Sequence, residues 1–224
     1  TEIYTLSLHD ALPIYYRHTL KPEDKILRAA RRVQAIAQAG LHYAENEFDR
    51  QRYQELRDLS VELSAAATDM DMGKIRDLFT NETGFQTPKV DVRSVVIKNN
   101  KILLARERSD GGFSLPGGFA DINNSPSETA VKEVREETGL EVRTSRLLAV
   151  IDTDRHCFPP LEYHYYKLVF LCDLIGGELC DSNETTEAGF FDFDNLPQLS
   201  EKRNTGQLFD LIRRQLNSSL TYYD

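Results

Sequence analysis

The chain has no tryptophan, only two methionines and only three cysteines among its 224 residues. The cysteines are Cys157, Cys172 and Cys180, an odd number without the spacing of metal ligands. A disulfide framework is therefore not expected, and the pattern is typical of reduced thiols in the cytoplasm. Long apolar runs are also absent, because no segment approaches the roughly 18 residues that a membrane-spanning helix needs.

Basic residues are scarce relative to acidic ones, with 27 against 36, and the formal net charge is −9. A protein that binds long nucleic acids by neutralising phosphates needs a basic face, so this class is disfavoured. A small phosphate-bearing substrate remains open, because a bound metal ion can supply positive charge. The length and the 40% hydrophobic content suit a globular protein of one large or two small domains.

Residues 1–14 read TEIYTLSLHDALPI, which is similar to the in-frame translation of a common sequencing-library adapter at every codon. The segment has neither the positively charged start nor the small-residue cleavage site of a signal peptide. We therefore expect residues 1–14 to be an artefact that packs on nothing and is disordered.

In the remaining chain, the residue pattern changes from helical to strand-like near residues 81–89. Before this point apolar residues recur at helical spacing, with a helix stop expected at Gly40 and a helix N-cap at Asp49. Residues 15–85 are therefore expected to form a small all-α domain. One apolar stripe is predicted along its first helix: Ile26, Ala29, Ala30, Val33, Ile36 and Ala37.

After Pro88, β-branched and apolar runs predict strands. The turn signal Asn99-Asn100 indicates a hairpin between Val90–Ile97 and Ile102–Ala105. Residues 86–224 are therefore expected to form an α+β domain. Its further strands are predicted at Arg146–Ile151, Tyr163–Leu174 and Phe190–Phe193, and its helices at Pro126–Thr138 and Gly206–Leu216.

The densest group of residues that could bind a ligand or take part in catalysis lies in residues 115–140, LPGGFADINNSPSETAVKEVREETGL. Ser125 is a strong helix start, because proline follows it and a glutamate lies three residues later. Gly139 is a natural helix end. Upstream, Gly117 and Gly118 allow the backbone to approach a ligand closely, and both are candidate substrate contacts.

Three carboxylates share one face of this predicted helix. Glu133, Glu136 and Glu137 occur at positions i, i+3 and i+4, where their charges repel one another. A hard divalent cation such as Mg²⁺ would turn that repulsion into binding, because it prefers carboxylate oxygens and usually arrives with substrate phosphates. The alternative is a solvated helix face.

These residues resemble the signature of the Nudix hydrolase family, G-x5-E-x7-R-E-U-x-E-E-x-G-U, where U is aliphatic. Asn124 stands where the signature has its first glutamate, and Lys132 stands where it has arginine. The resemblance implies an α/β/α sandwich with a mixed sheet. It also implies hydrolysis of a nucleoside diphosphate linked to another moiety, with Mg²⁺ or alternatively Mn²⁺. The matching positions are Gly118, Glu133, Val134, Glu136, Glu137, Gly139 and Leu140.

The preceding helical segment looks like the N-terminal domain of a bacterial Nudix subgroup known for CDP-choline pyrophosphatase activity. The phrases QAIAQAGLHYAENEFDRQRYQELRDLS and FTNETGFQTPKVDVR carry this likeness. It favours a CDP-choline-like substrate, with ADP-ribose second, and a homodimer formed through the helical domain.

The resemblance also implies roles for the carboxylates. Glu136 and Glu137 are the expected principal metal ligands, and Glu133 is expected to be a ligand or a water-activating base. The family often adds an acid from a later loop. Glu187 is the candidate for it, with Glu184 the runner-up.

Four side chains outside the carboxylates are candidate substrate contacts. Arg93 and Arg106 flank strands that lead toward the glycine loop, and arginine suits bidentate phosphate contacts, with a solvated strand edge as the alternative. His164 and Tyr166 belong to an aromatic run that suits stacking of a base or enclosure of a quaternary ammonium. Core packing explains alternate members of this run equally well.

Two other function classes stay open. A catalytically weak Nudix-like sensor would bind a nucleotide without turnover, and the retained glutamates count against it. An RNA-end-processing hydrolase would take a short strand end, since the negative charge disfavours long RNA. Neither a membrane nor a long nucleic acid is expected as a partner.

Overall fold

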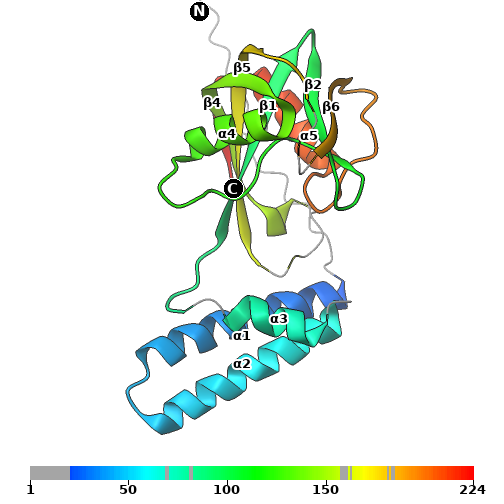
Figure 1. Cartoon of the computed structure of the whole chain (residues 1–224). Helices are drawn as coiled ribbons and strands as arrows, with labels where there is room; N and C mark the ends of the chain where they lie inside the picture. The colour runs from blue at the N-terminus through cyan, green and yellow to red at the C-terminus, as the bar shows by residue number, and fades with distance from the viewer. Residues whose placement is uncertain are drawn as a thin grey trace, which may run out of the picture.

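The computed structural model describes residues 21–68, 71–80, 83–156, 161, 163–180, 182 and 185–224. The adapter-like segment 1–14 lies outside the described residues, so its prediction stays open. Figure 1 shows a helical unit at one end of a sheet domain. None of the described helices is long and apolar enough to cross a membrane.

The second helix of the helical unit has a different N-cap from the predicted Asp49. Asn46 accepts a hydrogen bond from the Asp49 amide (2.8 Å), so Asn46 is the N-cap and Asp49 lies inside the helix. The first helix also continues past Gly40, where a Cβ would lie 2.3 Å from the Tyr53 ring. Glycine therefore serves helix packing here rather than helix ending. The helices are α1 (Pro22–Tyr43), α2 (Glu47–Ala67) and α3 (Met72–Thr80).

Small and polar side chains, rather than the predicted apolar stripe, fill the contact between α1 and α2. Ala30 is buried as expected, but Ile26 and Ile36 are 39% and 45% exposed. Gln34 is buried instead, and it accepts a hydrogen bond from the Ser60 hydroxyl of α2 (3.1 Å). The predicted isoleucines Ile26 and Ile36 therefore stay on the outside of this contact, while Leu27 is buried at 2% exposure.

The sheet is mixed, as expected. Its order is β3-β2-β1-β5-β4-β7, and β6 pairs with β2. The pairs β1–β5 and β4–β7 are parallel, and the others are antiparallel. The strands are β1 (Lys89–Lys98), β2 (Lys101–Glu107), β3 (Phe113–Ser114), β4 (Leu140–Asp152), β5 (Tyr165–Gly177), β6 (Thr185–Asp192) and β7 (Tyr222–Tyr223).

One helix covers each face of this sheet, α4 (Pro126–Thr138) on one side and α5 (Gly206–Leu216) on the other (Figure 1). Side chains of β1 alternate between the two faces: Val92 packs with Val134 of α4, and Val95 packs with Leu208 of α5. The sheet domain is therefore an α/β/α sandwich preceded by a helical unit.

The helical unit contacts the connection between β4 and β5, which contains the short helix η2 (Thr153–Arg155). Arg31 of α1 donates to the Asp154 carboxylate (2.6 Å) and to the Tyr163 carbonyl (2.9 Å). The Tyr163 side chain packs against Val61 and Ile75 of the helical unit. An ion pair and an apolar contact thus join the two parts.

Candidate active site

The loop between β3 and α4 lies beside β1 like an extra edge strand. The Val92 amide donates to the Gly118 carbonyl (2.8 Å), and Asp91 forms a β-bridge with Phe119. At Gly117 the backbone φ is +148°, and a Cβ there would lie 2.0 Å from the Val92 carbonyl oxygen. Only glycine fits this position, which holds the loop against the sheet.

α4 begins and ends as the sequence predicts. The Ser125 hydroxyl accepts from the Glu128 amide (3.2 Å), and the Glu128 carboxylate accepts from the Ser125 amide (2.8 Å). Gly139 ends the helix in the left-handed conformation, with φ 75°. These two ends determine where the glutamates of α4 lie relative to the loop.

Glu137 and Glu133 both reach the glycine loop. Glu137 is 4% exposed, and its Oε2 accepts a hydrogen bond from the Gly117 amide (3.1 Å). A Cβ at Gly118 would lie 3.3 Å from the Glu133 carboxylate, so that carboxylate lies against the loop backbone. The structure thus brings two of the three predicted glutamates together at one short stretch of backbone.

Glu136 lies apart from them, at the exposed rim of α4 beside Lys132. The Lys132 Nζ is 2.8 Å from Asp121, 3.7 Å from Glu136 and 3.9 Å from Glu133. Its hydrogen bond to Asp121 is the main cause that raises the pKa of Lys132. Lysine therefore meets these carboxylates as a point charge, whereas the arginine of the signature would offer a planar fork.

Burial raises the pKa of Glu137 from 4.5 to about 8. The charges of Glu107 and Glu133 contribute to this rise, whereas Arg93 and the Gly117 amide oppose it. Such a site gains stability from an added cation. Carboxylate oxygens beside a backbone that a ligand can approach closely fit Mg²⁺ or Mn²⁺.

Arg93 lies in the interior of the sheet domain and not at a solvated strand edge, which was the alternative, and its role as a substrate contact stays a prediction. Its guanidinium donates to Asp91 (2.8 Å) and to the Leu115 carbonyl (3.0 Å), and Lys167 also donates to Asp91. Although burial opposes ionisation, the two basic groups lower the pKa of Asp91 to about 2. The Arg93 side chain is 4% exposed, so its charge acts on Glu137 from within the protein.

Glu107 is a buried carboxylate that the sequence analysis did not select. Its side chain accepts a hydrogen bond from the Ser114 hydroxyl and lies 3.1 Å from Arg203 Nε. It is 5% exposed and lies next to the exposed Arg106, so it points to the same face of β2 as the buried Leu103 and Ala105. The sequence signal that could have identified Glu107 is its position as an acidic residue two places after the apolar run that ends at Ala105.

Arg106 and Glu187 form a cross-strand pair between β2 and β6. Their side chains are 3.7 Å apart, and both are about half exposed. Arg106 also donates to the Gly111 carbonyl (3.0 Å). The roles of Arg106 as a substrate contact and of Glu187 as a late-loop acid stay predictions, and the runner-up Glu184 lies outside the described residues.

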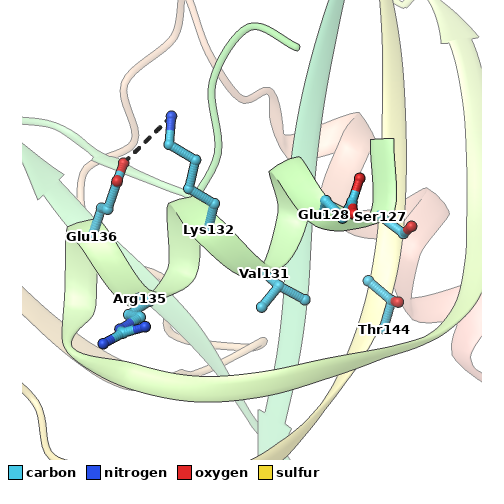
Figure 2. A pocket seen from close by; sticks show the side chains of 7 residues that line it. All are labelled: Ser127, Glu128, Val131, Lys132, Arg135, Glu136 and Thr144. Carbon is cyan, nitrogen blue, oxygen red and sulfur yellow. Dashed lines mark ion pairs between the residues drawn. The ribbon is translucent and has the colours of Figure 1, made fainter. Parts of the chain in front are cut away.

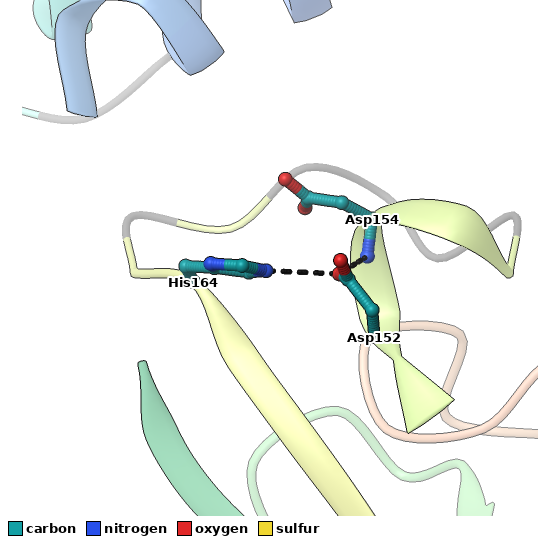
Figure 3. A group of neighbouring side chains, drawn as sticks. All are labelled: Asp152, Asp154 and His164. Atoms are coloured by element: carbon teal, nitrogen blue, oxygen red, sulfur yellow. Dashed lines mark hydrogen bonds and ion pairs between the residues drawn. The ribbon is translucent and has the colours of Figure 1, made fainter. Parts of the chain in front are cut away.

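His164 and Tyr166 lie at the start of β5, near the helical unit. His164 Nε2 is 2.9 Å from Asp152, and its ring packs edge-on against Tyr166. Figure 3 shows Asp154 completing a group whose spacing would suit a metal. Because Asp154 already pairs with Arg31, this group also joins the two parts of the chain. A substrate contact by His164 or Tyr166 stays a prediction.

A hollow of about 590 Å³ follows the outer face of α4. Figure 2 shows Lys132 and Glu136 on one side of the helix and Arg135 on the other. Glu133 and Glu137 are not among its lining residues, so the hollow adjoins the carboxylate pair rather than containing it. Its lining residues are Ser127, Glu128, Val131, Lys132, Arg135, Glu136 and Thr144.

Comparisons with known proteins match both parts of the chain. Residues 87–212 match the NUDIX domain, and residues 24–79 match a domain described as UDP-X-like, N-terminal oligomerisation domain. YjhB of Bacillus subtilis, whose name assigns it provisionally as an ADP-ribose pyrophosphatase, is 47% identical over 198 residues. That match covers 87% of this chain and 95% of YjhB.

Two solved structures are also similar. The crystal structure of a UDP-X diphosphatase is 35% identical with a TM-score of 0.59, covering 90% of this chain and 99% of that one. An ADP-ribose pyrophosphatase from Streptococcus suis is 38% identical with a TM-score of 0.56, covering 62% of this chain and all of that one. The NUDIX match spans more than half of the chain. The chain therefore belongs to the Nudix hydrolase family, as a pyrophosphohydrolase with a UDP-X-like helical domain at its N-terminal side.

Proposed function

We propose that the protein hydrolyses the pyrophosphate bond of a nucleoside diphosphate linked to another moiety, with Mg²⁺ or Mn²⁺ as its cofactor. The observation that carries this proposal is the convergence of Glu133 and Glu137 on the backbone of Gly117 and Gly118. When bound, a divalent ion neutralises diphosphate oxygens and lowers the pKa of the attacking water.

In this proposal, the acidic residues of the site bind the cation and transfer protons, and Arg93 tunes one of them. Glu133 and Glu137 would hold the cation at the loop, and Glu136, exposed on the same helix, is the third candidate ligand. Glu133 alternatively accepts the proton of the attacking water, and Glu187 is the candidate late acid. Arg93 keeps the Glu137 carboxylate ionisable from within the protein, because its charge lowers the pKa that burial raises.

For the substrate, we propose a compound of the ADP-ribose or CDP-choline type. The sequence resemblance favours CDP-choline, whereas the names of the similar proteins favour ADP-ribose and a UDP-linked compound. All of these substrates share a nucleoside diphosphate, so the proposed chemistry at the glutamates is the same.

The test is hydrolysis of a panel by the full chain, with Mg²⁺ or with EDTA. The panel contains CDP-choline, CDP-ethanolamine, ADP-ribose, UDP-glucose, FAD and nucleoside triphosphates. Metal-dependent cleavage of the diphosphate compounds supports the proposal, and the preferred member identifies the leaving group. Nucleotide binding without any cleavage would overturn it in favour of a sensor.

We also propose a homodimer, formed through the outer face of the helical unit, in a cytoplasmic protein. Leu56, Leu59 and Leu63 lie on one side of α2 and are 36%, 44% and 40% exposed. Such a stripe is typical of an interface rather than of free surface. The matched oligomerisation domain supports this assignment.

A further inference from the structure

Phe119 presents one face of its ring to solvent directly after the glycine loop. Its side chain is 56% exposed, which is high for a phenylalanine so close to a buried site. The opposite face stacks on Tyr165, with 5.5 Å between ring centroids and 17° between ring planes. Phe119 is therefore held from behind while its free face stays available.

The strand register places Phe119 on the same side of the sheet as Asp91 and Arg93. Phe119 and Asp91 oppose each other in an antiparallel bridge, so their side chains share a face. Arg93 follows Asp91 by two residues in the same strand and bonds to it. Phe119 also directly follows Gly118, against which the Glu133 carboxylate lies, so the aromatic ring is one residue away from the contact between the glutamates and the loop.

A row of aromatic rings connects this ring to the helical unit. Tyr165 packs edge-on against Tyr163, with 6.3 Å between centroids. Tyr163 in turn packs against the helical core at Val61 and Ile75, and the Lys89 ammonium lies 4.7 Å from its ring centroid. The position of Phe119 is thus supported by the helical unit through two tyrosines.

We propose that the exposed face of Phe119 is a stacking subsite for the nucleobase of the substrate. This inference rests on the proposed function, and it assigns the base to Phe119 while the diphosphate lies at the glutamates. A flat, delocalised base gains contact area and dispersion on a ring that is already immobilised by Tyr165. Stacking tolerates any base, so Phe119 contributes affinity for nucleotides in general rather than for one base.

Kinetics provide the first test. F119A is expected to raise KM for ADP-ribose and for CDP-choline about 5- to 150-fold, the range found when a base-stacking aromatic is removed. The kcat value should change little, because the stack is the same in the ground state and the transition state. F119Y keeps the ring and should stay within about twofold of the wild type. An unchanged KM in F119A would overturn the proposal.

Fluorescence provides a test that does not depend on turnover. Because the chain has no tryptophan, F119W introduces a single reporter at the subsite, and I122W introduces one at a 91% exposed position of the same loop. With Mg²⁺, α,β-methylene-ADP is expected to quench F119W and not I122W, while methylenediphosphonate, which lacks the base, quenches neither.

The outcomes separate the subsite from the reaction. Equal responses of F119W and I122W, or quenching of F119W by methylenediphosphonate, would overturn the subsite even if the wild type hydrolyses the panel. Conversely, base-dependent quenching of F119W by α,β-methylene-ADP in a protein that cleaves no diphosphate would support the subsite and refute the proposed reaction.

Discussion

Glu137→Gln is expected to stabilise the metal-free protein at neutral pH while abolishing turnover. Below pH 4.5 the Glu137 carboxyl is protonated in both the folded and the unfolded chain. As pH rises toward 8, the unfolded chain releases this proton and the folded chain keeps it, because burial raises the folded pKa to about 8. The folded state then binds more protons, so the free energy of unfolding falls as pH rises.

Glutamine has nearly the same shape and no charge, so E137Q removes this dependence and can still accept from the Gly117 amide. At about 1.4 kcal/mol per pH unit, the penalty on the wild type reaches about 3 kcal/mol at pH 7 and levels off above the folded pKa. The advantage of the variant should therefore be small at pH 5 and grow to about this size at pH 7.

Urea unfolding in EDTA at pH 5, 6 and 7, followed by circular dichroism, measures this difference. Asp91, Lys167 and the histidines are common to both proteins, so their titration cancels. E136Q is the matched control: its carboxylate lies on the same helix but 59% exposed, and this variant should keep the slope of the wild type. Parallel pH profiles for E137Q and the wild type would refute the reasoning. Added Mg²⁺ should restore the stability of the wild type far more than that of E137Q.

Three further predictions concern other parts of the chain. E187Q should lower kcat about 10²- to 10⁴-fold if Glu187 is the late acid, with less than about 1 kcal/mol lost in urea unfolding because its pair with Arg106 is exposed; an unchanged kcat would exclude that role. R31A removes two charged hydrogen bonds between the domains and should lower the free energy of their association by about 1–3 kcal/mol. Limited proteolysis should then cleave faster between the domains, and R52A, which changes an exposed arginine, serves as the control. L59E should convert the proposed dimer to a monomer in light scattering after gel filtration, and a dimer that persists would remove the outer face of α2 as the interface.

Local signals predicted the two helices of the sheet domain, because their ends are determined by nearby residues. Ser125 and Gly139 close α4 through contacts within four residues. β4 was predicted too short, since it begins at Leu140 rather than Arg146. Its first part alternates buried Val142 with exposed charged residues, and a strand with one wet face has too polar a composition to stand out.

Burial within the site depended on contacts that spacing does not reveal. Glu136 and Glu137 are neighbours in the signature, yet one is exposed and the other is buried under the glycine loop. Arg93 and Glu107 reach the site only through the pairing of their strands with segments distant in the sequence. In the helical unit, Gln34 is buried although it lies outside the predicted apolar stripe, because Ser60 of another helix supplies its hydrogen-bond partner.

The negative charge of the protein and its proposed anionic substrate are compatible because the same carboxylates oppose the substrate and attract its counterion. Without a cation, Glu107, Glu133 and Glu137 repel a diphosphate, and the raised pKa of Glu137 records their mutual repulsion together with burial. A bound divalent ion would offset two of these negative charges and would offer the diphosphate oxygens a cation to contact. The buried Arg93 lowers the free-energy cost of ionising Glu137, although its guanidinium stays hydrogen-bonded to Asp91. It therefore favours the ionised carboxylate that a cation needs but does not take the place of the cation. Metal and substrate should therefore bind as one unit, with the base on Phe119 completing the contact.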